Sequence, residues 1–176
     1  MTPLHSKVPV YILGFMGSGK TTVGRQLAKL LKYDFIDLDK AIEEAANKSI
    51  KQIFEEDGEA HFREIEKQQL EKTFTYTATV ISCGGGTPCF FDNMHLMNEH
   101  GITIYLRMNE KELYSRLKNV KHERPLLAGK THDELLNFIS EKLKEREVFY
   151  KKAKHFVKGL DVNVGDIVRL INSDNK

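Results

Sequence analysis

Features that often reveal where a protein works are scarce in this sequence. It has only two cysteines, Cys83 and Cys89, and they lack the paired spacing of a zinc site or a redox motif. No run approaches the ~18 consecutive apolar residues of a membrane span, and residues 1–9 lack the charged start and apolar run of a signal peptide. We therefore expect reduced, buried thiols in a cytoplasmic protein that does not contact a membrane.

An excess of charge is also missing. The chain has 27 Lys and Arg against 25 Asp and Glu, and both signs are mixed along the sequence, which is typical of solvated helix surfaces. A nucleic-acid partner is not expected, because it would need Lys and Arg clustered on one face. The 7 histidines follow no metal-ligand spacing. A length of 176 residues suits one domain, residues 1–176, without an internal linker or repeat.

The pattern of apolar residues alternates between strand-like and helix-like segments. Short apolar runs predict strands at residues 8–15, 33–39, 78–83, 101–107 and 155–161. Helical spacing predicts helices at 20–31, 40–72 (short helices broken near Gly58), 109–117, 131–150 and 166–171. This alternation predicts an α/β fold, a three-layer α/β/α arrangement around a central five-stranded parallel sheet. Ligands in such folds bind at the carboxyl ends of the strands.

The first strand-like run leads into a glycine-rich loop. Residues 14–21, GFMGSGKT, fit GxxxxGK[ST] between a predicted strand and a predicted helix, the context in which this pattern is specific for phosphate binding. Its backbone N–H groups and the start of the helix would cradle phosphates, Lys20 would reach the β- and γ-phosphates, and Thr21 would offer an oxygen to Mg²⁺. We expect ATP, because Asn47-Lys48 is not followed by the acid of the guanine-reading NKxD motif.

Two acids follow the second strand-like run. Asp37 and Asp39 are two residues apart, so at the end of a strand both side chains would project to one face. If the second strand lies near the first, this face is beside the glycine-rich loop. One acid could then hold a metal and the other an acceptor. A surface acidic turn is the alternative, since exposed Asp is common.

The motifs together resemble the shikimate kinase family along most of the chain. Those that carry the resemblance are the glycine-rich loop, Asp37-Leu38-Asp39, Phe62-Arg63-Glu64-Ile65-Glu66, Gly84-Gly85-Gly86, Arg124-Pro125-Leu126-Leu127, and Arg146 with Tyr150. The resemblance implies a P-loop fold like that of nucleoside-monophosphate kinases, with a mobile lid at about 118–131 and a substrate-binding helical region at about 40–72. It implies phosphorylation of the 3-hydroxyl of shikimate by ATP with Mg²⁺, in aromatic amino-acid biosynthesis, by a monomer.

The resemblance also implies roles for single residues. Arg63 and Arg146 correspond to arginines that bind the substrate carboxylate, a task that suits the bidentate guanidinium. Asp39 corresponds to the acid that accepts a hydrogen bond from the attacking hydroxyl, and Arg124 to a lid cation that closes onto the transferred phosphoryl group. The expected catalytic residues are Lys20, Asp39 and Arg124. The residues expected to bind ATP are Gly17, Ser18, Gly19, Lys20, Thr21, Thr22, Arg116 and Arg124. The residues expected to bind shikimate are Asp39, Arg63, Gly84, Gly85, Gly86 and Arg146. The residues expected to hold the metal are Thr21 and Asp37.

Several alternatives stay open at the level of sequence. Arg63 and Arg146 could be surface ion-pair partners, since acids lie near both, and Arg116 could be an ordinary exposed helix residue. The loop at residues 161–165 has no counterpart of the arginine that the family often places near adenine. A kinase of the same fold that acts on gluconate or a nucleoside monophosphate, or a non-catalytic ATP-binding switch, would share the glycine-rich loop.

Overall fold

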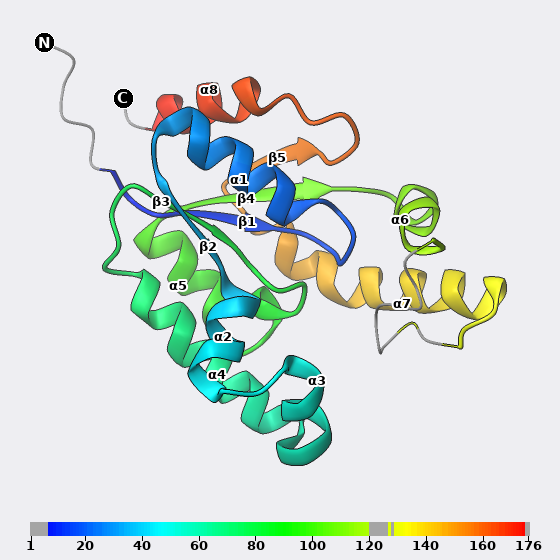
Figure 1. Cartoon of the computed structure of the whole chain (residues 1–176). Coiled ribbons are helices and arrows are strands. Elements are labelled where there is room, and N and C mark those ends of the chain that lie inside the picture. Colours follow the sequence, from blue (N-terminus) through cyan, green and yellow to red (C-terminus); the bar gives the residue numbers. More distant parts are fainter. Residues whose placement is uncertain (1–6, 120–126, 128, 175–176) are drawn as a thin grey trace, which may run out of the picture.

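The computed structural model describes residues 7–119, 127 and 129–174, in which strands and helices alternate (Figure 1). The strands are β1 (Val10–Leu13), β2 (Asp34–Asp37), β3 (Thr79–Ser82), β4 (Ile102–Arg107) and β5 (His155–Lys158). The α-helices are α1 (Lys20–Leu31), α2 (Leu38–Ala46), α3 (Ile50–Gln52), α4 (Gly58–Thr73), α5 (Asn93–His100), α6 (Glu110–Leu117), α7 (His132–Tyr150) and α8 (Val164–Asp174). A π-helical turn (Ile53–Asp57) precedes α4, and a 3-10 turn (Thr87–Cys89) follows β3.

The five strands form one parallel sheet in the order β2-β3-β1-β4-β5. Val10 of β1 pairs in register with Val80 on one side and Ile102 on the other. All residues of β1 and β3 are buried, as expected for central parallel strands that are covered on both faces. The carboxyl ends of β1, β3 and β2 therefore lie side by side at one edge of the sheet, where parallel α/β folds bind ligands.

Helices cover both faces of this sheet. Figure 1 shows α1 and α8 on one face and α4, α5 and α7 toward the other. The side chains of β1 alternate between two apolar clusters: Val10 and Ile12 lie in one with Leu27 of α1, and Tyr11 and Leu13 lie in the other. The predicted three-layer fold with a parallel five-stranded sheet is confirmed.

Hydrogen-bonded caps fix where the helices that border the edge of the sheet begin. At the start of α6, Asn109 and Glu112 exchange hydrogen bonds, and Thr131 and Glu134 do the same at the start of α7. Such capping boxes satisfy N–H groups that the first helical turn leaves without partners. They place Arg116 in the last turn of α6 and fix the course of α7, which carries Arg146.

The observed boundaries correct several sequence-based expectations. Helix α1 has the predicted bounds, and Gly58 begins α4 as the predicted break suggested. The strand expected at 33–39 ends at Asp37, and that at 155–161 ends at Lys158. Helix α5 was not predicted. Most of the expected lid, including Arg124, lies outside the described residues.

Within the described parts of the chain, no helix is both long enough and apolar enough to cross a lipid bilayer.

Candidate active site

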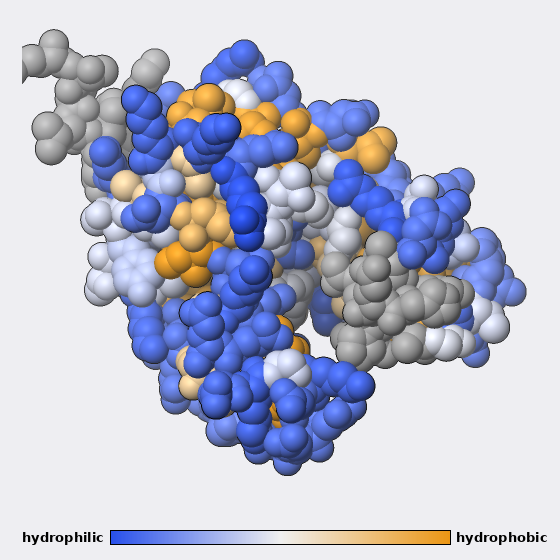
Figure 2. All heavy atoms as spheres, viewed as in Figure 1, coloured by the Kyte–Doolittle hydropathy of each residue, from blue (hydrophilic) through white to orange (hydrophobic). Residues whose placement is uncertain are grey.

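The carboxyl ends of β1, β2 and β3 open onto a cavity of about 280 Å³. In Figure 2 the surface is hollowed between the lobe of α2, α3 and α4 and the side of the molecule that carries α7. The cavity collects many of the residues predicted from sequence, together with Met16, Ser82 and Cys83, which were not predicted. Its lining residues are Met16, Gly17, Gly19, Lys20, Thr21, Thr22, Asp37, Asp39, Ser82, Cys83, Gly84 and Gly85.

The glycine-rich loop curls over the start of α1. Gly17 and Gly19 have φ values of +78° and +90°, a region that glycine adopts without strain. A Cβ at Gly17 would also lie 2.8 Å from Leu117 Cδ2. No side chain caps the start of α1, and its first turn carries no acid. The N–H groups of this turn and the positive end of the helix dipole are therefore available to an anion.

Lys20 extends back along the inside of the loop. Its Nζ donates a hydrogen bond to the carbonyl oxygen of Phe15 at 2.9 Å. The ammonium group also lies close enough to Asp39 to lower the pKa of that carboxyl. Lys20 thus places a positive charge between the loop and the acid that faces it across the cavity.

Three side-chain oxygens meet where α1 faces the ends of β2 and β3. Thr21 Oγ1 donates to Asp37 Oδ2 at 3.0 Å and lies 3.4 Å from Ser82 Oγ. Among the described residues, no three His, Cys, Asp or Glu side chains cluster as a protein-only metal site. The donor set nevertheless fits a hard cation such as Mg²⁺, which prefers oxygen ligands and keeps several waters or phosphate oxygens.

Asp37 and Asp39 reach the cavity by a different route from the one predicted. The strand ends at Asp37, which caps α2 by accepting a hydrogen bond from the N–H of Asp39 at 3.2 Å. Asp39 lies in the first turn of α2, so the expectation that both side chains project from one face of a strand is wrong. Strand β3 also separates β2 from β1. The turn from strand to helix, rather than a shared strand face, brings both acids to the cavity.

Asp39 lines the cavity as a carboxyl in an unusual electrostatic setting. Burial raises the pKa of its carboxyl to about 6; Lys20 opposes this rise, whereas the acids Asp37, Glu66 and Glu43 add to it. Such a carboxylate is ionised at neutral pH yet takes up a proton more readily than an exposed one. This combination is typical of groups that accept protons in active sites.

Arg63 is held in place by two acids and two aromatic rings. Its guanidinium donates to Glu59 Oε1 at 3.1 Å and to Glu66 Oε2 at 2.8 Å. It lies 3.9 Å from the ring centroid of Phe90 and 5.0 Å from that of Phe62. Arg63 is therefore buried and not a surface residue, but it does form the ion pair with Glu66 that the alternative proposed, and its role toward a substrate stays a prediction.

Glu66, which faces Arg63, was not predicted as a site residue. It is 1% exposed, and its second oxygen accepts a hydrogen bond from Thr87 Oγ1 at 2.6 Å. The spacing of three residues in a helix placed Glu66 beside Arg63, but sequence alone could not show that the pair is buried. Glu66 thereby connects Arg63 to the turn that follows the triple glycine.

The triple glycine allows three charged side chains to approach the main chain. A Cβ at Gly84 would lie 3.0 Å from Asp39 Oδ1, and one at Gly86 would lie 2.8 Å from both terminal nitrogens of Arg63. A Cβ at Gly85 would lie 3.1 Å from Arg146 Nη1. A side chain at Gly84, Gly85 or Gly86 would therefore displace one of these charged groups, and the three groups converge on one short stretch of backbone.

Arg146 comes from α7. Its guanidinium lies 5.6 Å from the ring centroid of Phe15. The adjacent acid, Glu147, forms its ion pairs with Arg107 and Lys151 on the outside of the helix. The structure therefore brings Arg146 to the same place as Arg63, from a different helix.

Arg116 is exposed, and its Nη1 donates to the carbonyl of Gly17 at 3.4 Å, so it lies over the glycine-rich loop.

The two cysteines differ in burial. Cys83 is buried as predicted, whereas Cys89 is only partly buried. Burial raises the pKa of both thiols, that of Cys89 to about 11.

Comparison with known proteins finds similarity to shikimate kinases in sequence and in structure. A family model described as shikimate kinase matches residues 16–172. A shikimate kinase of Parabacteroides distasonis is 51% identical over 144 residues, which are 82% of this chain and 83% of the relative. A crystal structure of shikimate kinase from Bacteroides thetaiotaomicron matches with a TM-score of 0.88 at 40% identity, covering 94% of this chain and 98% of that chain. A shikimate kinase from Acinetobacter baumannii in complex with shikimate matches with a TM-score of 0.83 at 32% identity, covering 97% and 96%.

Proposed function

This chain belongs to the shikimate kinase family, and we propose that it transfers the γ-phosphoryl group of ATP to the 3-hydroxyl of shikimate, in aromatic amino-acid biosynthesis. The observation that carries the proposal is one cavity lined by Lys20 of the glycine-rich loop and by Asp39, with Arg63 and Arg146 converging on the triple glycine beside it. A non-catalytic nucleotide-binding switch would need only the glycine-rich loop with Lys20. The additional presence of Asp39, Arg63 and Arg146, which could bind an acceptor, favours an enzyme.

The donor side would bind the triphosphate of ATP. The backbone of the glycine-rich loop and the uncapped start of α1 offer N–H donors, and Lys20 adds a cation that can contact the β- and γ-phosphates. Ser18 lies in this loop, Thr22 in the first turn of α1 and Arg116 over the loop, and all three are proposed to complete the nucleotide site. Arg124 is proposed to close onto the phosphoryl group from the lid.

Thr21 and Asp37 are proposed to hold Mg²⁺, Thr21 directly and Asp37 near the ion. Support comes from their oxygen atoms, which lie 3.0 Å apart and beside the loop. Bound Mg²⁺ would neutralise charge on the β- and γ-phosphate oxygens.

The acceptor side would bind shikimate through its carboxylate and its hydroxyls. Arg63 and Arg146 present guanidinium groups from two different helices, and each can bind a carboxylate through two parallel hydrogen bonds. The absence of side chains at Gly84–Gly86 would let the ring lie against the main chain, where Gly85 offers its N–H group. These contacts would aim the 3-hydroxyl at Asp39 and the glycine-rich loop.

In the proposed reaction the 3-hydroxyl oxygen bonds to the γ-phosphorus, and the bond from that phosphorus to the β–γ bridging oxygen breaks. ADP leaves with the electron pair, and the hydroxyl proton passes to a carboxylate oxygen of Asp39. A carboxyl whose pKa is raised to about 6 is ionised at neutral pH and can accept this proton. Since phosphoryl transfer depends mainly on alignment and electrostatics, Asp39 would act chiefly by holding the hydroxyl in line.

The family resemblance extends to the organisation of the chain. We propose a lid at about residues 118–131, a substrate-binding helical region at about 40–72, and one kinase domain over residues 1–176. A monomeric state and a cytoplasmic location are likewise proposals.

Identification of the product by NMR tests the proposed reaction. The chain is incubated with ATP, MgCl₂ and shikimate, and phosphorus and proton spectra are recorded. We expect one new phosphate monoester whose phosphorus couples to the proton on carbon 3 of the ring. Coupling to another ring proton would contradict the position, and release of inorganic phosphate alone would contradict the acceptor.

A further inference from the structure

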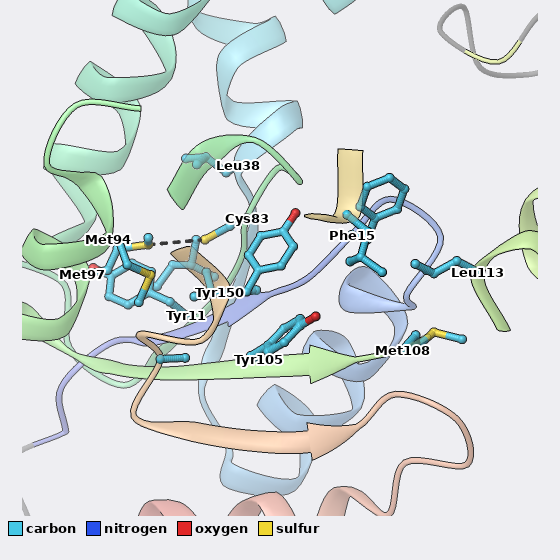
Figure 3. Packing of buried hydrophobic residues seen from close by; sticks show 14 of the residues in the cluster. Tyr11, Phe15, Leu38, Cys83, Met94, Met97, Tyr105, Met108, Leu113 and Tyr150 are labelled. Atoms are coloured by element: carbon cyan, nitrogen blue, oxygen red, sulfur yellow. Dashed lines mark hydrogen bonds between the residues drawn. The ribbon is translucent and has the colours of Figure 1, made fainter. Parts of the chain in front are cut away.

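A buried tyrosine ties α7 to the triple glycine. Tyr150, in the last turn of α7, is 0% exposed, and its hydroxyl donates a hydrogen bond to the carbonyl oxygen of Gly85 at 2.5 Å. Its ring stacks at an angle on Tyr105 of β4, with the centroids 5.0 Å apart. Figure 3 shows both rings within the apolar cluster, beside Cys83 and Phe15. The hydroxyl is therefore directed by a rigid, buried ring.

The partner of this hydrogen bond lies in the acceptor site. The carbonyl of Gly85 shares its peptide group with the N–H of Gly86, and Gly86 packs against the guanidinium of Arg63. Fixing the carbonyl fixes the plane of that peptide, because the peptide bond is planar. A residue outside the cavity lining thus controls the orientation of backbone that lines it.

Tyr150 is also connected to Arg146. The two residues are four apart in α7, so they lie on the same face of the helix, one turn from each other. Arg146 Nη1 lies 3.1 Å from the position of a Cβ on Gly85, whose carbonyl accepts from Tyr150. The positive charge of Arg146 opposes the increase in the pKa of the Tyr150 hydroxyl that burial causes. The hydroxyl group and the guanidinium thus contact the same glycine.

We infer that Tyr150 is a positioning residue for the acceptor: by binding the carbonyl of Gly85 it holds the triple glycine and Arg146 in the single arrangement that fits a small hydroxylated carboxylate. The inference rests on the proposed function, since it assigns Gly85 and Arg146 to the acceptor. Tyr150 does not touch the reacting atoms. It acts on the groups that bind the carboxylate and the ring. The contacts of these groups with the substrate are equally strong in the ground state and in the transition state. Loss of the Tyr150 hydroxyl therefore changes KM rather than kcat.

The test compares the kinetics of Tyr150→Phe with those of the unaltered chain in an ADP-release assay. The variant keeps the ring that packs on Tyr105 and removes only the hydroxyl. We expect KM for shikimate to rise roughly tenfold, the size that one buried hydrogen bond supports, while kcat and KM for ATP change less than about twofold. KM does not depend on the share of folded enzyme, so it reports positioning even if part of the preparation is unfolded.

Tyr11→Phe is the matched control. Tyr11 is also 0% exposed, and its hydroxyl bonds to Thr73 Oγ1 at 3.0 Å near the end of α4; neither Tyr11 nor Thr73 lines the cavity. The Tyr11→Phe variant should lose about as much stability as Tyr150→Phe, without a change in KM for shikimate. A second readout is a double-mutant cycle with Arg146→Lys, in which the two effects on KM should be clearly less than multiplicative.

Three outcomes overturn the inference: an unchanged KM for shikimate in Tyr150→Phe, an equal rise in KM in Tyr11→Phe, or multiplicative effects in the cycle. Failure of the proposed function is recognised separately, because the unaltered chain would then show no shikimate-dependent turnover at all.

Discussion

The hydroxyl of Thr21 donates a hydrogen bond to Oδ2 of Asp37 over 3.0 Å, joining the start of α1 to the end of β2. Strand β1, which leads into α1, is not a neighbour of β2 in the sheet, because β3 lies between the two strands. The other oxygen of Asp37 accepts from the N–H of Asp39. One carboxylate therefore connects the donor side of the site, at the glycine-rich loop, to the acid on the acceptor side.

Asp37→Asn should weaken the use of Mg²⁺. The amide keeps the size of the carboxylate but loses its charge, and groups that orient a metal site typically change metal affinity by about 10- to 100-fold when altered. We expect the Mg²⁺ concentration for half-maximal ADP release to rise by a factor in that range, with KM for shikimate changed far less. Titration of MgCl₂ at fixed ATP and shikimate measures this. Asp34→Asn, at the exposed start of the same strand, is the control, and an equal effect in it would refute the assignment.

The pH dependence of turnover should report Asp39. Its carboxyl has a pKa raised to about 6, and only the ionised form accepts a hydrogen bond and a proton from the substrate hydroxyl. The value of kcat/KM should therefore fall tenfold per pH unit below about pH 6 and level off above it. A profile that stays flat down to pH 5 would exclude the ionised Asp39 from the reaction.

Asp39→Asn should stabilise the folded chain in a pH-dependent way. Below pH 3.8 the carboxyl is protonated in both the folded and the unfolded states and costs nothing. Between pH 3.8 and about 6 the unfolded chain releases the proton and the folded chain keeps it, so stability falls as pH rises. Above about pH 6 the carboxyl is ionised in both states, and the destabilisation caused by burying its charge is fully present. We expect the variant to gain on the order of 1–2 kcal/mol at pH 7.5, discounted for partial exposure, and nothing below pH 4, as measured by urea unfolding.

The fold was predictable from sequence where local patterns decide it. The run of apolar residues before Gly14 predicted β1, and the helical spacing of apolar residues after Lys20 predicted α1. Both are local signals that short stretches of sequence carry by themselves. Helix α5 has few apolar residues and lies between a glycine turn and a strand, so its pattern was too weak. The end of β2 was misjudged because Asp37 caps the next helix, and the residues 33–39 carry both apolar and acidic side chains that fit either element.

Arg63 should show separate effects on stability and on substrate binding. Arg63→Met leaves Glu66 as a buried charge with Thr87 as its remaining partner, which we expect to cost about 3–5 kcal/mol. Adding Glu66→Gln removes that charge and should restore most of the loss. The double variant should still have KM for shikimate raised roughly 10- to 100-fold, because the bidentate partner of the carboxylate is gone.

Thermal unfolding and steady-state kinetics of these variants separate the two effects. Arg25→Met is the control, since Arg25 also lies over an aromatic ring, Phe35 at 5.1 Å, but on the exposed face of α1. Recovery of normal KM in the Arg63→Met, Glu66→Gln double variant would mean that Arg63 serves only the fold.

The candidate site was predictable as far as charged residues in motifs could reveal it. Lys20, Asp39, Arg63 and Arg146 were named from the sequence, and the structure brings them to one edge of the sheet. The roles of the groups that hold them were not predicted, because burial and partners across long sequence distances leave no local pattern. Glu66 and Tyr150 were named from the sequence only as members of the motifs that carry the family resemblance, at helical spacings of three and four residues from the two arginines.

An ADP-release assay with a panel of acceptors tests which small molecule this chain phosphorylates. The chain with Mg·ATP is offered shikimate, quinate, gluconate and AMP, and the assay is repeated with Asp39→Ala and Arg63→Ala. We predict turnover with shikimate well above that with gluconate or AMP, reduced at least 100-fold in kcat/KM in both variants. Turnover with gluconate or AMP but not with shikimate would contradict the acceptor assignment, and no turnover with any acceptor despite ATP binding would contradict catalysis itself.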